Sequence, residues 1–134
     1  MNYWLVKSEP LTYSFERLLV EKHASWDGVR NYAARLHLKG MKLSDLVLVY
    51  HSGEQKAVVG LARVKKEFYQ DPTDSTGEWV AIDLIPVQKF IKPVPLQKIK
   101  QDAILKKTML VKIGRLSVMP LSKEQFERFL ELGS

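Results

Sequence analysis

The stretch from Ser25 to Arg35 carries the densest group of side chains able to bind a ligand. It reads Ser-Trp-Asp-Gly-Val-Arg-Asn-Tyr-Ala-Ala-Arg and shows no simple core periodicity, which is more typical of a site lining than of a core segment. Trp26 offers a flat aromatic face, Asp27-Gly28 is a turn signal, and Asn31 suits the cap of a helix. The sequence therefore predicts a stacking surface beside the start of a helix.

These side chains suit the binding of a nucleobase outside its stack. Such a base needs an aromatic face, partners for its polar edge and neutralised phosphates nearby. Trp26 can stack on the base or can plug a sheet as a half-buried tryptophan, and its polar neighbours favour stacking. Asn31 can pair with a base edge or cap the helix, and both roles stay open.

Two further polar segments follow expected strands. Ser8 and Glu9 come after the first strand, where a carboxylate can accept from the exocyclic amine of cytosine or adenine. Glu9 can equally pair with Lys7 or Arg30 at the surface. His51-Ser52 ends another strand and can donate to a base carbonyl, although a lone histidine at a strand end is often structural.

The segment from Arg115 to Ser117 leads into the last expected strand. Its guanidinium and backbone groups can hold a base edge or a phosphate, and a plain surface arginine is the alternative. The lysine-rich stretches 39–42 and 98–107 are more typical of solvated faces. The formal net charge of +6 favours an anionic partner, but a lysine-rich surface explains that charge equally well.

Length and composition limit the classes of protein to consider. The 134 residues fit one domain, and 46% apolar with 27% charged residues is typical of a globular chain with a core. Cysteine is absent and the three histidines lack ligand spacing, so we expect no disulfide, metal or other cofactor. No apolar run approaches the ~20 residues of a membrane span, and no export signal is evident. We expect a cytoplasmic monomer that binds no membrane.

Alternating and continuous apolar runs predict a sheet. Gly60 interrupts one run in the way a β-bulge requires, and Pro93 and Pro95 are expected to close another. Short turns between the strands favour a small, strongly bent sheet or partial barrel. The expected strands lie at residues 3–7, 45–51, 58–68 and 79–87, with a short one before residue 120.

Capping residues predict the helices. Ser14 and Asn31 each precede a helical pattern, and Ser122 with Gln125 forms a capping box for a last helix that ends at Gly133. One or two weak helical turns are expected over 96–105. The fold class is therefore α+β, with five or six strands flanked by three or four short helices.

Four separated motifs carry a resemblance to a known family. They are Tyr-Trp-Leu-Val-Lys-Ser-Glu-Pro at 3–10, Trp-Asp-Gly-Val-Arg-Asn-Tyr at 26–32, Tyr-His-Ser at 50–52 and Arg-Leu-Ser-Val at 115–118. In this order the chain closely resembles the EVE domain family over nearly its whole length. The resemblance implies one EVE domain over 1–134, with a small bent β-barrel similar to the PUA and YTH domains.

The resemblance also implies a function. Family members are linked to modified bases such as 5-methylcytosine, and others to modified RNA, so a non-catalytic module that accepts a modified base of DNA or RNA is expected. The base-binding residues carried over are Lys7, Ser8, Glu9, Trp26, Val29, Asn31, His51, Ser52, Arg115, Leu116 and Ser117.

The chain departs from the family pattern at three positions. Many relatives have Gln at the position of Ala33 and Asn at that of Leu36, so polar contacts from these two positions do not carry over. Many also have Asn where this chain has Gly53, which leaves the recognised base edge undetermined.

Two other classes of function remain as alternatives. One is a nuclease or glycosylase with Asp27, Glu9 or His51 as acid or base, but no paired-carboxylate or metal-ligand spacing supports it. The other is a small-molecule or protein-interaction domain whose pocket takes a nucleoside-like ligand.

Overall fold

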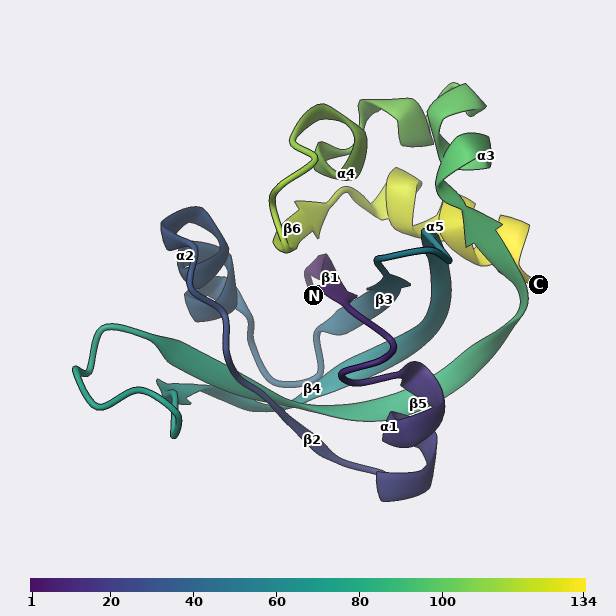
Figure 1. Cartoon of the computed structure of the whole chain (residues 1–134). Coiled ribbons are helices and arrows are strands. Elements are labelled where there is room, and N and C mark those ends of the chain that lie inside the picture. The colour runs from purple at the N-terminus through teal and green to yellow at the C-terminus, as the bar shows by residue number, and fades with distance from the viewer.

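The computed structural model describes residues 1–134, and a single sheet organises them (Figure 1). Helices connect several of the strands, and one helix follows the last strand. In chain order the elements are β1 (Tyr3–Ser8), α1 (Phe15–Glu21), β2 (Ala24–Trp26), α2 (Tyr32–Gly40), β3 (Leu46–His51), β4 (Ala57–Gln70), β5 (Val80–Pro95), α3 (Leu96–Gln101), the 3-10 helix η1 (Leu105–Lys107), α4 (Met109–Lys112), β6 (Val118–Leu121) and α5 (Lys123–Gly133).

The six strands form one mixed sheet in the order β2-β5-β4-β3-β1-β6. β1 and β3 are parallel, and every other pair is antiparallel. The α+β class and the bent sheet predicted from the sequence are confirmed. The predicted barrel needs a correction, because β2 and β6 remain as two free edges and the sheet does not close.

The two longest strands, β4 and β5, make the bend. Their pairing shifts register at four places, one of them between Val58 and Gly60 as the sequence predicts. Such shifts increase the local twist of a strand pair. At Gly60 the ring of Phe15 from α1 lies against the backbone, so that an added Cβ would come within 2.5 Å of it. Glycine therefore lets α1 pack directly on the bent strand.

The strand β5 ends at Pro95 as predicted, but Pro93 does not close it. β5 runs on to Pro95, and its pairing with β4 passes from Lys89 directly to Val94. Because proline has no N–H to donate, it fits the unpaired stretch that contains Pro93. The short helix α4 was not predicted from the sequence, since its four residues carry no capping signal.

The predicted helix caps are confirmed. Ser14 Oγ accepts from the Arg17 amide at 3.1 Å, and Asn31 Oδ1 accepts from the Ala34 amide at 3.0 Å. At α5, Ser122 and Gln125 form both bonds of a capping box. Gly133 differs slightly from expectation because it is the last helical residue rather than the one after it.

The core lies on both faces of the central strands. Leu5 and Val6 of β1 and Leu48 of β3 are fully buried, as expected for central strands covered on both sides. On one side Tyr3 stacks on Phe126 of α5, with ring centroids 4.5 Å apart. No helix combines the length and apolar character required to cross a membrane.

The contact between Phe15 and Gly60 generates a stability prediction. Gly60→Ala forces its new methyl group against the ring, and such overpacking typically costs about 1–3 kcal/mol. Urea denaturation monitored by circular dichroism measures the change. Gly114→Ala is the matched control, because no heavy atom lies within 4 Å of its added Cβ. Equal unfolding midpoints for the two variants would contradict the close packing.

Candidate functional site

A pocket of about 490 Å³ opens between the two ends of the sheet. Ser25 and Trp26 of edge strand β2 form one wall, while Lys7 of β1 and Ser117, just before edge strand β6, form the other. Its size lies in the range of ~300–1,000 Å³ typical of small-molecule sites. The remaining lining residues are Ser8, Glu9, Thr12, Tyr13, Asp27, Gly28, Val29 and Arg30.

Six of the eleven residues singled out in the sequence line this pocket. They are Lys7, Ser8, Glu9, Trp26, Val29 and Ser117. Their motifs are far apart in the chain, and the bend of the sheet brings them together.

Trp26 belongs to the core and also lines the pocket. Only 8% of its surface is exposed, and Tyr13 meets it edge-on with ring centroids 6.0 Å apart. Its indole N–H has no hydrogen-bond partner, yet the structure contains no enclosed polar atom without one. The N–H is therefore accessible and can donate to a ligand.

The turn after β1 fixes the polar wall of the pocket. Ser8 Oγ donates to the Tyr13 carbonyl at 2.5 Å, and the Glu9 carboxylate accepts a backbone N–H of the following turn at 2.7 Å. Lys7 Nζ donates to the Gly114 carbonyl at 2.7 Å, and burial lowers the pKa of this lysine. Glu9 forms no ion pair with Lys7 or Arg30, and its Oε1, which lies beside Gly53, takes no hydrogen bond and stays available as an acceptor.

A hydrogen-bonded chain sets the direction of the Ser25 hydroxyl. Tyr69 Oη donates to the Asp83 carboxylate and lies 2.7 Å from Ser25 Oγ. Burial and the bond to Asp83 raise the pKa of Tyr69, so the phenol keeps its single proton for Asp83. Ser25 must then donate to Tyr69, which leaves its Oγ as an acceptor toward the pocket.

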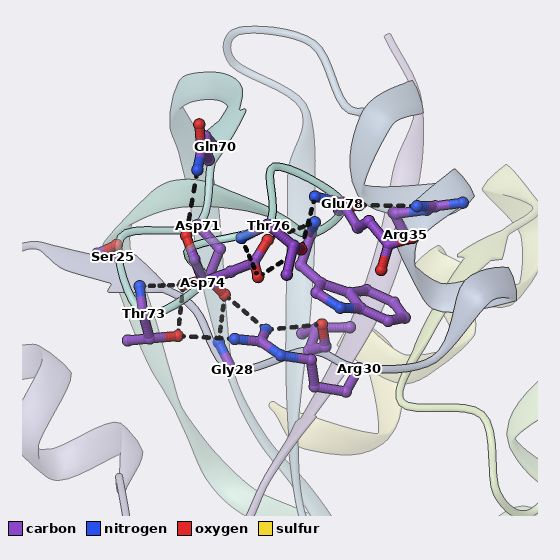
Figure 2. Close-up of polar contacts among 12 residues, drawn as sticks. Ser25, Gly28, Arg30, Arg35, Gln70, Asp71, Thr73, Asp74, Thr76 and Glu78 are labelled. Atoms are coloured by element: carbon purple, nitrogen blue, oxygen red, sulfur yellow. Dashed lines mark hydrogen bonds and ion pairs between the residues drawn. The ribbon is translucent and has the colours of Figure 1, made fainter.

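Asp71 holds the wall formed by residues 27–30. Its carboxylate is fully buried and accepts from Gly28 N at 2.7 Å and from Arg30 Nη1 at 2.9 Å (Figure 2). The other oxygen accepts from the amide and hydroxyl of Thr73 at 2.7 and 2.6 Å. Burial alone would raise the pKa of Asp71, but the bonds from Thr73, Arg30 and Gly28 lower it to about 2. The sequence did not predict this contact, because nothing local links position 71 to position 28.

A cluster of rings and guanidinium groups fastens the 71–79 loop to α2. Arg35 lies over Tyr32 and Trp79, with its Cζ 4.9 and 5.4 Å from the two ring centroids. Arg30 lies 5.7 Å from the Trp79 centroid, and Arg35 also donates to the Glu78 carbonyl at 2.7 Å (Figure 2). The cluster supports the same wall that Asp71 holds.

His51 and Ser52 do not line the pocket. His51 is 2% exposed, and its Nε2 accepts from the Phe15 amide at 3.0 Å. Its Nδ1 therefore carries the proton and donates to Gln55 Oε1 at 2.7 Å. Because both ring nitrogens are bonded within the protein, His51 has the structural role that the sequence left open as an alternative to base binding. Ser52 lies on the far side of Lys7, in an adjoining pocket.

Three other predicted site residues also lie outside the pocket. Asn31 uses its Oδ1 in the helix cap, and Leu116 is buried in the core. Arg115 is exposed and forms no hydrogen bond or ion pair. The departures at Ala33 and Leu36 are exposed and do not line the pocket either.

Comparison with known proteins identifies the family. The model of the EVE domain family matches residues 2–132. This chain belongs to the EVE domain family. Thymocyte nuclear protein 1 of mouse is 34% identical to this EVE domain over an alignment of 165 positions, which covers 98% of this chain and 73% of that protein.

Solved structures of EVE domain relatives share the fold. A protein from Agrobacterium tumefaciens is 36% identical, with a TM-score of 0.96 over all of this chain and 94% of its own. The human THYN1 protein, solved in complex with DNA containing 5-methylcytosine, is 30% identical, with a TM-score of 0.91 over all of this chain and 98% of its own.

The buried carboxylate generates a pH prediction. Because its pKa falls from 3.8 to about 2 on folding, ionised Asp71 stabilises the native state above pH 3.8, and this stabilisation is lost as the pH falls through about 2. At ~1.4 kcal/mol per pKa unit, Asp71→Asn should lower the free energy of unfolding at pH 7 by about 2 kcal/mol. The difference from wild type should shrink below pH 4, as measured by urea denaturation at several pH values.

Asp27→Asn is the control for this series. Asp27 is exposed, lines the same pocket and makes no side-chain hydrogen bond, so its effect should stay within about 0.5 kcal/mol at every pH. A difference between wild type and Asp71→Asn that stays constant down to pH 2 would contradict the role given to Asp71.

Proposed function

We propose that this EVE domain is a non-catalytic nucleic-acid-binding module that holds one modified nucleobase, such as 5-methylcytosine, in the pocket between β1 and β2. The observation that carries the proposal is the convergence of an aromatic wall and free acceptors in one pocket. The human relative solved with DNA containing 5-methylcytosine supports it.

The acceptors suit the amino edge of a base. Glu9 keeps one carboxylate oxygen free, and Ser25 Oγ presents an acceptor, so both can take hydrogen bonds from an exocyclic amine. Trp26 supplies the aromatic wall and an accessible N–H for a base carbonyl. Together these groups can meet donors and acceptors on one edge of cytosine.

No covalent step is part of this function. The imidazole of His51, a candidate acid or base, keeps both nitrogens inside the protein. Glu9 and Asp27 line the pocket without an ion pair or a hydrogen bond to each other. These placements favour binding over a nuclease or glycosylase reaction.

Size limits what a methyl group can contribute. Burying one methyl is worth ~0.8 kcal/mol, or about fourfold in affinity. Sharper discrimination requires that the unmodified base leave a void or an unsatisfied polar group in the pocket.

The test is a titration with matched oligonucleotides that carry cytosine, 5-methylcytosine, adenine or N6-methyladenine at one position. We expect 5-methylcytosine to bind about fourfold or more tightly than cytosine by fluorescence anisotropy. Trp26→Leu should weaken binding by about fivefold or more, because stacking contributes ~1–3 kcal/mol per base. Glu9→Gln should weaken it while leaving the fold intact.

Glu54→Gln is the matched control for Glu9→Gln, because Glu54 is exposed and lies outside the base pocket. Thermal unfolding checks that Trp26→Leu remains folded. Absence of binding to any oligonucleotide or nucleoside at low salt, where phosphate attraction is strongest, would overturn the proposal. Equal binding of free nucleosides and oligonucleotides without salt dependence would favour a small-molecule site instead.

A further inference from the structure

A second pocket adjoins the first across Lys7. It measures about 260 Å³, and Lys7 lines both pockets. The other polar side chains of the second pocket are Tyr50, Ser52, Lys56 and Lys100. β1, β3, the turn after β3 and helix α3 supply these residues, so separate parts of the fold converge here.

The two pockets differ in charge. The first is lined by two cations, Lys7 and Arg30, and two carboxylates, Glu9 and Asp27, and since Arg30 is paired with Asp71 it has no excess of positive charge. The second contains three lysines and no carboxylate. A neutral base therefore suits the first pocket and an anion suits the second.

Two of the three lysines of the second pocket are free to meet an anion, whereas Lys7 donates to the Gly114 carbonyl. Lys56 and Lys100 are exposed and form no ion pair or hydrogen bond through their ammonium groups. Glu54 shares a neighbouring hollow with these two lysines, and Asp102, two residues from Lys100, is paired with Arg128. Glu9 Oε1 lies near the Gly53 rim, where an added Cβ would come within 2.8 Å of it. Because Gly53 lines the second pocket, this one carboxylate stands at its border, but the three lysines that line the pocket outnumber it.

Hydroxyl groups add uncharged donors. Tyr50 is 4% exposed, its Oη has no hydrogen-bond partner, and the structure leaves no enclosed polar atom unpaired, so this hydroxyl is accessible. Burial raises the pKa of Tyr50, so the phenol keeps its proton for donation. The Ser52 hydroxyl also forms no bond within the protein. Ammonium and hydroxyl donors around one hollow match the oxygens of a phosphate.

We propose that the second pocket binds a phosphate group of the nucleotide whose base occupies the first pocket, so that the nucleotide straddles Lys7. This inference rests on the proposed function and names the second half of its ligand. It also gives Ser52 a role on the phosphate side rather than at the base edge. A phosphate beside Lys7 offsets the burial that lowers the pKa of that lysine.

Calorimetric titration with three small ligands tests the inference: 5-methyl-2′-deoxycytidine, its 5′-monophosphate and its 3′-monophosphate. We expect one monophosphate to bind roughly tenfold more tightly than the nucleoside at low salt, and this advantage to shrink as salt rises. In the double variant Lys56→Asn with Lys100→Gln the advantage should disappear, while the nucleoside affinity stays within about twofold. Asparagine is chosen because Lys56 has a φ of 47°, which asparagine tolerates.

Lys98→Gln is the matched control, because Lys98 is an exposed lysine of the same helix α3 outside the second pocket. It should retain the full phosphate advantage. If the nucleoside binds but neither phosphate adds affinity, the inference fails and the proposed function stands. A phosphate advantage that survives in the double variant, or inorganic phosphate that binds as tightly as the monophosphate, also overturns it. If no ligand binds, the proposed function fails as well.

Discussion

The fold depends on a sheet that bends without closing. β4 and β5 shift register four times, and the resulting curvature turns edge strand β2 toward the side of the sheet where β6 ends. β2 has three residues and β6 has four, too few to extend across the opening as a paired ladder. Sheet edges are normally covered or kept short to avoid unwanted pairing. Here the two short edges border an opening, and that opening is the site.

Because the sheet does not close, part of the pocket wall must be held by contacts other than strand pairing. The segment after β2 has no strand partner, and the buried carboxylate of Asp71 holds it through one amide and one guanidinium. Burial makes this charge costly unless donors surround it, and four bonds meet it. The rings of Tyr32 and Trp79 then hold the loop that carries Asp71 against α2. The wall is therefore fixed by electrostatics and stacking rather than by a ladder.

The features that the sequence predicted correctly depend on residues close together in the chain. Caps at Ser14, Asn31 and Ser122, and the bulge at Gly60, depend on neighbours within a few residues, and all four are present in the structure. The barrel closure and the strand end at Pro93 depend on register between distant segments, which one sequence does not reveal.

The residues of the site also fall into those that the sequence predicts locally and those that only the fold reveals. Motif positions such as Trp26 and Ser117 lie at the pocket. The contacts of His51 with Phe15 and of Asp71 with Gly28 join residues 36 and 43 positions apart and carry no local signature. The acceptor direction of Ser25 follows from a chain that runs through β4 and β5. Such features require the folded arrangement of the strands.

The pocket joins the two ends of the chain. Lys7 donates to the Gly114 carbonyl, 107 positions away, and its own amide donates to the Ser117 carbonyl at 2.9 Å. During synthesis on the ribosome, β1 leaves the exit tunnel long before its partners near residue 117 exist. A nascent chain therefore has no complete pocket until the segment around residue 117 has been made. Long-range closure of this kind also slows folding, since the loop entropy must be overcome before the contact forms.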